Sequence, residues 1–199
     1  MIYQRFFKRV LDILCAATGI LVLSPLLLVL AVWVKVDSPG PVLFRQKRVG
    51  KNKQLFCILK FRTMYADTPK DVPTHLLQNP EAMITRSGRF LRRTSLDELP
   101  QLFNILVGQM SVVGPRPALW NQDDLIAERD KYGANALVPG LTGWAQANGR
   151  DELPIPVKAS LDGYYVRHIS FWLDVRILLK TACGVVKGDG VVEGGTHGV

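Results

Sequence analysis

An acidic pair close to a proline is the first feature of the chain that could carry out chemistry. Asp97 and Glu98 lie in the segment Ser95-Leu-Asp-Glu-Leu-Pro-Gln101. Pro100 favours a helix that begins at Asp97, because the first turn of a helix tolerates a proline that has no N–H. The positive end of the helix dipole would keep both carboxylates ionised. The pair is therefore a candidate nucleophile or Mg²⁺ ligand.

The same spacing also has a purely structural interpretation. Ser95 and Glu98 stand three residues apart, as in a capping box, where two side chains satisfy the free amides at a helix start. In that frame Pro100 would fall at the fifth helical position, where the lost hydrogen bond is costly. Spacing alone leaves both interpretations open.

Several basic residues stand beside turn-forming residues or beside another cation. They lie in the motifs Lys60-Phe-Arg62-Thr-Met, Arg92-Arg93, Gly114-Pro-Arg116-Pro and Gly149-Arg150. Arginine suits phosphate because its planar fork donates two parallel hydrogen bonds. We interpret Lys60, Arg62, Arg92, Arg116 and Arg150 as candidates for substrate binding, and chiefly for phosphate groups. Each of them taken alone also fits an ordinary surface cation.

A glycine-containing stretch, Pro139-Gly-Leu-Thr-Gly-Trp-Ala-Gln146, could bring main chain and Gln146 close to a flat ligand such as a base. An ordinary irregular loop is the alternative. The histidines are scattered at positions 75, 168 and 197, so the sequence suggests neither a histidine triad nor a zinc site. The three cysteines lack metal-type spacing and are expected to be reduced cytosolic thiols.

An apolar segment would place these groups at a membrane. From Ile13 to Val34 the chain has 22 residues without a charge, which as a helix extend about 33 Å, enough to cross a bilayer. Ser24-Pro25 lies at the centre, and Pro25 cannot donate to the Leu21 carbonyl, so a break or kink is expected. Lys and Arg flank both ends, and these residues normally stay in the cytoplasm. The pattern predicts a re-entrant segment, with an ordinary kinked span as the alternative.

The net charge of +8 is unevenly distributed. Residues 1–62 carry eleven Lys and Arg against two Asp and Glu, whereas residues 63–199 carry fourteen against fifteen. Anionic lipid head groups would attract the basic region beside the apolar segment. A nucleic-acid-binding protein would spread its positive charge over the folded domain, so we expect no nucleic-acid partner.

The remaining pattern predicts an α+β fold that is predominantly helical. Residues 1–36 form an amphipathic N-terminus and the membrane segment, residues 37–187 one cytoplasmic domain, and residues 188–199, with five glycines, a flexible tail. Strands are expected at 42–46 and 55–60, joined as a β-hairpin. Helices are expected at 3–12, 87–93, 96–107, 121–132, 160–167 and 171–187, and loops at 65–82 and 137–150. The first and last of these helices would lie at the membrane interface.

Taken together, the motifs are more specific than any one of them. The order Ser24-Pro25, Lys60-Phe-Arg-Thr-Met64, Ser95 to Gln101, Val113-Gly-Pro-Arg-Pro117, Pro139 to Gln146 and Leu173-Asp174 resembles the bacterial sugar transferase family, the small monotopic phosphoglycosyl transferases. The resemblance covers residues 3–187. One departure is Asp151, where the family often has Asn after Gly-Arg, and this puts the role of position 151 in doubt. The role of Asp174 is also left open.

This resemblance implies an enzyme that moves a phospho-sugar from a UDP-sugar to a polyprenyl phosphate such as undecaprenyl phosphate and releases UMP. It implies Mg²⁺, the catalytic dyad Asp97-Glu98, and a re-entrant membrane helix broken at Ser24-Pro25. The expected location is the bacterial inner membrane, with the catalytic domain on the cytoplasmic face, at the first membrane step of a glycoconjugate pathway. The sugar, the pathway and the oligomeric state, including a homodimer, are left open.

The residues fit such a mechanism. With Mg²⁺ between the donor phosphates and Asp97, that carboxylate could attack the sugar-linked phosphate and expel UMP, and the lipid phosphate would attack next. Glu98 could orient the metal site or assist proton removal. Two other functions stay in view: a membrane-anchored binding protein without activity, and a metal-dependent hydrolase of nucleoside diphosphate sugars.

Overall fold

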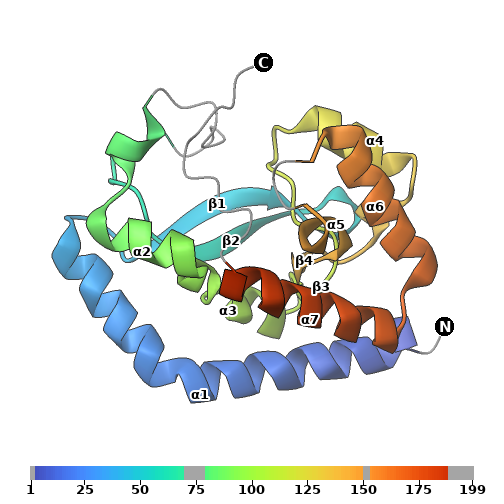
Figure 1. Ribbon diagram of the computed structural model, residues 1–199, viewed down its shortest axis with the longest axis horizontal. Helices are drawn as coiled ribbons and strands as arrows, with labels where there is room; N and C mark the ends of the chain where they lie inside the picture. The colour runs from blue at the N-terminus through green and yellow to red at the C-terminus, as the bar shows by residue number, and fades with distance from the viewer. Residues whose placement is uncertain (1–2, 70–78, 150–152, 188–199) are drawn as a thin grey trace.

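The computed structural model describes residues 3–69, 79–149 and 153–187. Most of these residues are helical, and the strands form small two-stranded sheets, so the predicted α+β, predominantly helical fold is confirmed. The longest helix, α1 (Lys8–Asp37), runs along one edge of the molecule, and the other elements lie on one side of it (Figure 1). The predicted Gly-rich tail lies outside the described residues.

Helix α1 is bent but continuous. A π-helical turn, η1 (Tyr3–Phe7), leads directly into it, so the amphipathic helix predicted at 3–12 is the start of the same rod rather than a separate element. Figure 1 shows the bend along α1, and Pro25 lies inside the helix. The hydroxyl of Ser24 donates to the Leu21 carbonyl at 2.8 Å and so replaces the bond that Pro25 cannot make. The predicted break is therefore a proline kink within one helix.

Much of α1 faces away from the protein. Leu21, Val22, Leu28 and Val29 are all exposed, although they are large and apolar. By length and composition α1 is the one helix among the described residues that could cross a membrane, with a mean hydropathy of 2.6 over its most apolar window. A helix buried in the core of a soluble protein would have covered these side chains.

The predicted hairpin is confirmed. Strand β1 (Leu43–Val49) pairs antiparallel with β2 (Leu55–Phe61), with Leu43 opposite Phe61 and Val49 opposite Leu55. The chain reverses through η2 (Lys51–Lys53), where Asn52 and Lys53 take left-handed φ values of 52° and 62°. Strand β1 extends to Val49 rather than ending at residue 46, and this extension brings Arg48 into the hairpin.

The chain then forms η4 (Pro80–Met83), α2 (Arg86–Thr94), η5 (Leu96–Glu98) and α3 (Gln101–Leu106). Helix α2 agrees with the prediction at 87–93. The single helix predicted at 96–107 is instead a 3-10 turn followed by a short α-helix, with Pro100 at the N-cap of α3. Proline is tolerated there because the N-cap needs no intrahelical donor.

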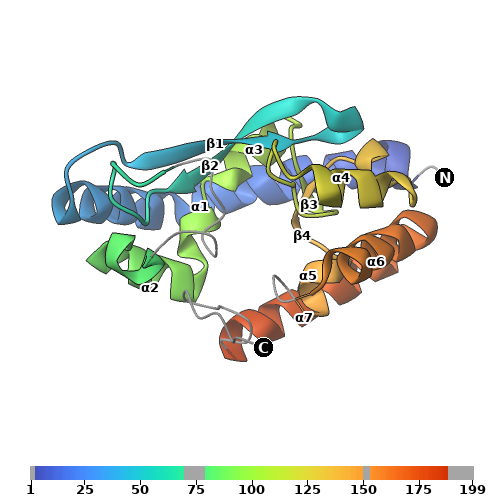
Figure 2. The same ribbon diagram turned by 90° about the horizontal axis from the view of Figure 1, so that it is seen from above.

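The second half of the chain contains a small parallel sheet. Strand β3 (Ser111–Val113) pairs with β4 (Gly140–Thr142), and the helices are α4 (Asp123–Asp130), α5 (Trp144–Ala147), α6 (Ile155–His168) and α7 (Phe171–Lys187), with a 3-10 turn η6 (Ala134–Ala136) between α4 and β4. The prediction for α7 is confirmed, and α6 begins at Ile155 rather than at residue 160. Strand β4 and helix α5 fall in the stretch predicted to be irregular. Figure 2 shows α6 and α7 together on the opposite side of the molecule from the hairpin.

Apolar clusters attach α1 to the rest of the protein. One contains Ala16, Ile58, Ile105 and Met110, and so joins α1 to β2 and α3. Another contains Leu30, Val34, Phe61 and Leu91, and joins the later part of α1 to β2 and α2. A third, with Val113, Tyr165, Leu173 and Ile177, packs α6 and α7 onto β3. The hairpin and α3 are thereby fixed directly above α1.

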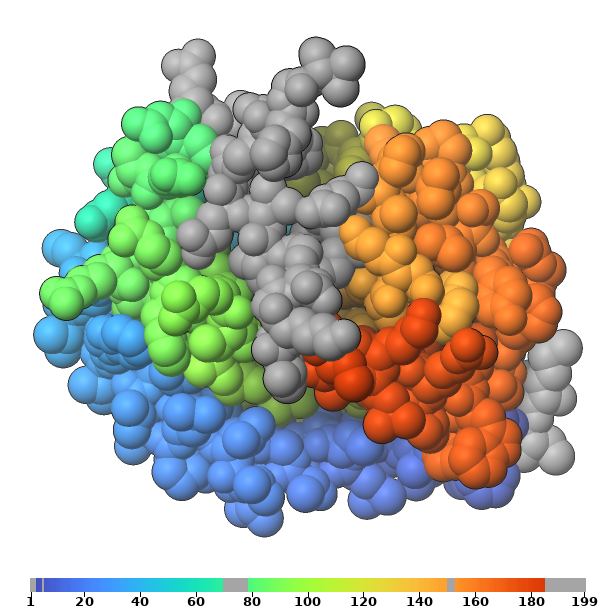
Figure 3. Space-filling model, viewed as in Figure 1, coloured from blue at the N-terminus to red at the C-terminus, as the bar shows by residue number. Residues whose placement is uncertain are grey.

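Polar contacts tie the start of α1 to α7. The ammonium group of Lys8 lies 2.7 Å from Asp174, and the Tyr3 hydroxyl donates to the same oxygen at 2.7 Å. Tyr165 donates to the other oxygen of Asp174 at 2.8 Å. In the space-filling view α7 accordingly lies against the N-terminal part of α1 (Figure 3). Asp174, whose role the sequence left open, thus anchors the N-terminus.

Candidate active site

The acidic pair lies in the turn η5, between α2 and α3. Ser95 has a left-handed φ of 57° and ends α2, where its amide donates to the carbonyls of Leu91 and Arg92. Its side chain makes no capping hydrogen bond to η5, so the capping-box interpretation is wrong. The turn leaves Asp97 and Glu98 just before the N-terminus of α3, close to the position expected from Pro100.

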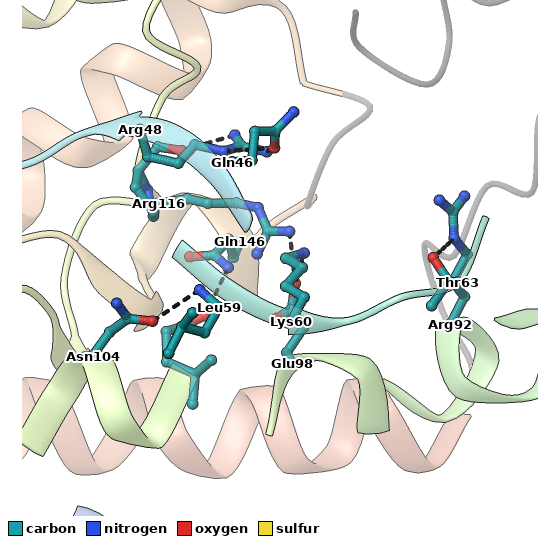
Figure 4. Close-up of polar contacts among 12 residues, drawn as sticks. Gln46, Arg48, Leu59, Lys60, Thr63, Arg92, Glu98, Asn104, Arg116 and Gln146 are labelled. Carbon is teal, nitrogen blue, oxygen red and sulfur yellow. Dashed lines mark hydrogen bonds and ion pairs between the residues drawn. The ribbon is translucent and has the colours of Figure 1, made fainter. Parts of the chain in front are cut away.

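Glu98 is held between two cations that come from different elements. Its Oε1 accepts from Lys60 Nζ of β2 at 2.7 Å and from Arg116 Nη2 at 2.9 Å (Figure 4). Burial by itself would raise the pKa of Glu98, but Arg116 and Lys60 outweigh it and hold that pKa far below its usual range. Glu98 is therefore a permanent anion that fixes both cations.

Asp97 has a different environment, although it is the next residue. Its side chain is 8% exposed, and within the described ranges its carboxylate accepts no hydrogen bond and forms no ion pair. Burial raises the pKa of Asp97, Lys60 opposes that shift, Glu98 adds to it, and Arg92 and Arg116 lower it again. A buried carboxylate whose oxygens are not engaged is poised to bind a cation or attack an electrophile.

Arg92 belongs to the same surroundings. It stands in the last turn of α2, and its Nε donates to Thr63 Oγ1 at 2.9 Å (Figure 4). Its positive charge lowers the pKa of Asp97. The structure therefore joins the predicted residues Lys60, Glu98 and Arg116 by ion pairs, with Asp97 next to Glu98, whereas Arg92 contributes to the electrostatics of Asp97.

The structure does not bring Arg62 to this site, which corrects the prediction. Its side chain is only 4% exposed and points to the end of α1, where Nη2 donates to the Ser38 carbonyl at 2.8 Å and Nη1 donates to that of Pro39. Carbonyls at the C-terminal end of a helix lack intrahelical donors. Arg62 satisfies these groups and fixes the turn between α1 and β1, so its role is structural.

Gln146 lies on α5, and only one end of its side-chain amide forms a hydrogen bond within the described residues. Its amide nitrogen donates to the Leu141 carbonyl at 3.2 Å, while its Oε1 is buried without a partner in the part of the chain that the structure describes. An unpaired buried acceptor is costly and is often completed by a ligand. This atom agrees with the predicted binding role. The predicted contact of Arg150, and position 151, lie outside the described residues.

Sequence reasoning missed two residues that organise the site. Asn104 of α3 is buried; its Oδ1 accepts from the Leu59 amide at 2.9 Å and its Nδ2 donates to the Cys57 carbonyl at 2.8 Å, which locks β2 onto α3. Arg48 of β1 donates to the Pro117 carbonyl at 3.1 Å. A polar residue inside the apolar run of α3 was the signal for Asn104, whereas Arg48 could not be told apart from the other basic residues near the membrane segment.

The acidic pair could bind Mg²⁺ only if substrate phosphates supplied some of the metal ligands. Among the described residues no group of three or more His, Cys, Asp and Glu side chains could hold a metal. Glu98 is engaged by cations, so Asp97 is the carboxylate of the pair that could serve as a metal ligand. Mg²⁺ is commonly held by one or two carboxylates together with substrate phosphates and water, and the donor set here agrees with that arrangement.

Comparisons with known proteins place this arrangement in a family. The sequence profile described as bacterial sugar transferase matches residues 3–188. The chain is 40% identical over 193 residues to the UDP-N-acetylgalactosamine-undecaprenyl-phosphate N-acetylgalactosaminephosphotransferase of Aeromonas hydrophila, covering 93% of this chain and 45% of that protein. It is also 40% identical over 198 residues to the UDP-glucose:undecaprenyl-phosphate glucose-1-phosphate transferase of Escherichia coli, covering 93% and 40%.

Another relative matches over nearly its whole length. The exopolysaccharide production protein PSS of Rhizobium leguminosarum bv. phaseoli is 40% identical over 196 residues, which cover 92% of this chain and 97% of that protein. The chain spans less than half the length of the first two relatives. The profile match over residues 3–188, together with this relative, shows that the chain belongs to the bacterial sugar transferase family.

Proposed function

We propose that the protein is a phosphoglycosyl transferase that moves a phospho-sugar from a UDP-sugar to a polyprenyl phosphate such as undecaprenyl phosphate, and releases UMP. The observation that carries the proposal is the contrast within the acidic pair. Within the described residues Asp97 is buried with its oxygens unengaged, and Glu98 beside it fixes Lys60 and Arg116 at 2.7 and 2.9 Å. The names of the relatives, which refer to UDP-sugars and undecaprenyl phosphate, support the substrate classes.

The cations serve the donor diphosphate. Lys60 and Arg116 are held in place by Glu98 before any substrate arrives, and Arg92 adds a third positive charge near Asp97. A site whose charges are already oriented stabilises a transferring phosphoryl group without reorganising during the reaction. Bound Mg²⁺ would neutralise the repulsion between the Asp97 carboxylate and the donor phosphates.

Asp97 then acts as the nucleophile. One carboxylate oxygen bonds to the sugar-linked phosphorus, the bond from that phosphorus to the UMP oxygen breaks, and the electron pair leaves with UMP. An oxygen of the polyprenyl phosphate next bonds to the same phosphorus, and the bond to Asp97 breaks and restores the carboxylate. The strongly lowered pKa makes Glu98 a poor proton acceptor, so its part is to orient Lys60 and Arg116.

The ends of α1 support a re-entrant arrangement in the bacterial inner membrane. At its start Lys8 binds Asp174, and Asp12 accepts from the Val112 amide at 2.8 Å. At its end Asp37 accepts from the amide and the hydroxyl of Ser87 at 2.9 and 2.8 Å. Since both ends are attached to one folded domain, the apolar middle would enter the membrane and return. The positive flanks favour the cytoplasmic face for that domain.

The test is UMP release by the purified full chain in detergent or lipid discs. We expect release to require a UDP-sugar and Mg²⁺, and sustained turnover to require polyprenyl phosphate as well. Sustained release without the lipid would identify a hydrolase instead. Binding of UDP-sugar with no release under any condition would favour a binding protein. A panel of UDP-sugars in the same assay identifies the sugar.

A further inference from the structure

Arg116 lies in a loop of residues 114–118. Other elements donate hydrogen bonds to every main-chain carbonyl of this loop from residue 115 to residue 118. The donors are the Gly140 amide to Pro115 at 2.9 Å, Arg129 Nη1 to Arg116 at 2.8 Å, Arg48 Nη1 to Pro117 at 3.1 Å and the Val49 amide to Ala118 at 2.9 Å. They come from β4, α4 and β1. A loop with two prolines supplies few amide donors of its own, so other elements must provide them.

Arg129 is the donor that acts on Arg116 itself. It lies on α4 and is 4% exposed, and its Nε and Nη2 lie 2.8 and 2.6 Å from Asp162 Oδ2 on α6. Asp162 is 1% exposed. Two nitrogens of the guanidinium thus engage the carboxylate, while the third donates to the Arg116 carbonyl. A lysine could not reproduce this fork, because it presents a single nitrogen.

The carbonyl that Arg129 binds controls the direction of the Arg116 side chain. Pro117 follows Arg116 and confines its backbone to extended conformations. Within that range the direction of the carbonyl fixes ψ, and with it the path from the main chain to the guanidinium that meets Glu98 at 2.9 Å. A rotation at this point would move the guanidinium away from Glu98.

We propose that Arg129, held by Asp162, is a positioning residue that fixes the main chain of Arg116 and thereby keeps its guanidinium at the donor-phosphate site. The inference rests on the proposed function for the role of Arg116. A buried ion pair is often no better for stability than an apolar pair of similar volume. The hydrogen bond to the Arg116 carbonyl gives this pair a second task that an apolar pair cannot perform.

The test is a double-mutant cycle on single-turnover UMP release by the full chain. Arg129→Lys should lower the rate by about 10- to 100-fold, the coupling found within one hydrogen-bonded network. In an Arg116→Ala background the same change should have almost no further effect, because Arg129 acts through Arg116. The control is Asp130→Asn, which lies on α4 like Arg129 and removes an exposed ion pair with Lys53 of η2. This variant should leave the rate unchanged. Equal losses from Arg129→Lys in both backgrounds would overturn the proposal.

A second variant separates positioning from folding. Arg129→Met combined with Asp162→Leu keeps an apolar contact between α4 and α6 and should preserve thermal stability, but it removes the donor to Arg116. We expect the rate to fall as in Arg129→Lys, and a normal rate would contradict the proposal. Hydrogen exchange at the amides of Gly114 and Gly140, which donate to the Thr142 and Pro115 carbonyls at 2.8 and 2.9 Å, should accelerate in these variants and not in Asp130→Asn. That readout needs no substrate, so it tests the positioning even if no variant, nor the natural chain, releases UMP.

Discussion

At the scale of single residues, the site depends on two adjacent carboxylates with opposite surroundings. Glu98 accepts from Lys60 and Arg116, whereas Asp97 is buried with no hydrogen bond in the described parts of the chain. The ion pairs lower the pKa of Glu98, and burial raises the pKa of Asp97. One carboxylate thus holds cations permanently, and the other is left for chemistry.

Asp97→Asn tests the nucleophile. The amide keeps the shape but loses the charge and the nucleophilic oxygen, so we expect turnover to fall by at least about 1,000-fold, as for other residues at the centre of a reaction. Thermal stability should be unchanged or slightly higher, because a buried unpaired carboxylate is costly. UMP release and a melting curve check both points. A near-normal rate in a folded variant would exclude Asp97 as the nucleophile.

Glu98→Gln tests the orienting role. Without the negative charge Lys60 and Arg116 repel each other and share only a neutral amide oxygen as acceptor, so we expect kcat/KM for the UDP-sugar to fall by about 100-fold or more. Glu128→Gln, which removes a carboxylate paired with Lys131 on α4, is the matched control and should behave as the natural chain. If Glu98→Gln kept full activity, the clamp on the two cations would have no part in catalysis.

The sequence predicted the members of the site better than their partners. Motif spacing and chemistry identified Asp97, Glu98, Lys60 and Arg116, and the structure assembles them. Arg62 could not be separated from them, because its partners are main-chain carbonyls at the end of α1 that no side-chain pattern reveals. The same holds for Arg129, whose acceptor is the carbonyl of Arg116.

At the scale of elements, the periodicity of the sequence predicted those helices and strands that are formed by a regular pattern of apolar side chains. It predicted the hairpin and α7 well, because these have strong apolar patterns. It missed the β3–β4 pair, where strands of three residues meet through glycines; a Cβ at Gly140 would lie 2.1 Å from the Gly114 amide nitrogen. A close approach of two main chains requires glycines, but it produces no periodic pattern of apolar residues from which a strand could be predicted.

Pro25→Ala tests the kink in α1. The new N–H can donate to the Leu21 carbonyl, so the helix should straighten and some molecules should adopt a true span. Single cysteines near residue 4 and in the domain, in a background without Cys15, Cys57 and Cys183, report which side each end faces. Leu26→Ala is the control, since its N–H is already present. Labelling from opposite sides in the natural Pro25 chain would reject the re-entrant arrangement.

At the scale of the whole molecule, the exposed apolar surface is concentrated on α1 and α7. Trp172 is 77% exposed at the start of α7, close to the contact between Lys8 and Asp174, and Leu179 on the same helix is also exposed. In Figure 3 α1 forms the lower rim of the molecule, and α7 lies next to the N-terminal part of this rim. This rim would place α7 at head-group depth, beside the phosphate of the lipid acceptor.

A fluorescent probe at Trp172 tests that orientation. With an environment-sensitive dye on Trp172→Cys, in the background without natural cysteines, we expect a blue-shifted emission in liposomes and quenching by lipid-borne nitroxide. The matched position is Val157→Cys on α6, which is also exposed but lies on another helix and should stay in water. Equal emission from the two positions would place α7 away from the membrane.

Transfer of the phospho-sugar through Asp97 can be followed directly by the mass of the intact protein. The full chain is mixed with UDP-sugar and Mg²⁺ and without lipid, and the mass and the released UMP are followed together. We expect an added phospho-sugar, about one UMP per active site, loss of the adduct when polyprenyl phosphate is supplied, and no adduct on Asp97→Asn. Release of UMP only when both substrates are present, with no adduct at any time, would contradict transfer through Asp97 and reduce this residue to a metal ligand.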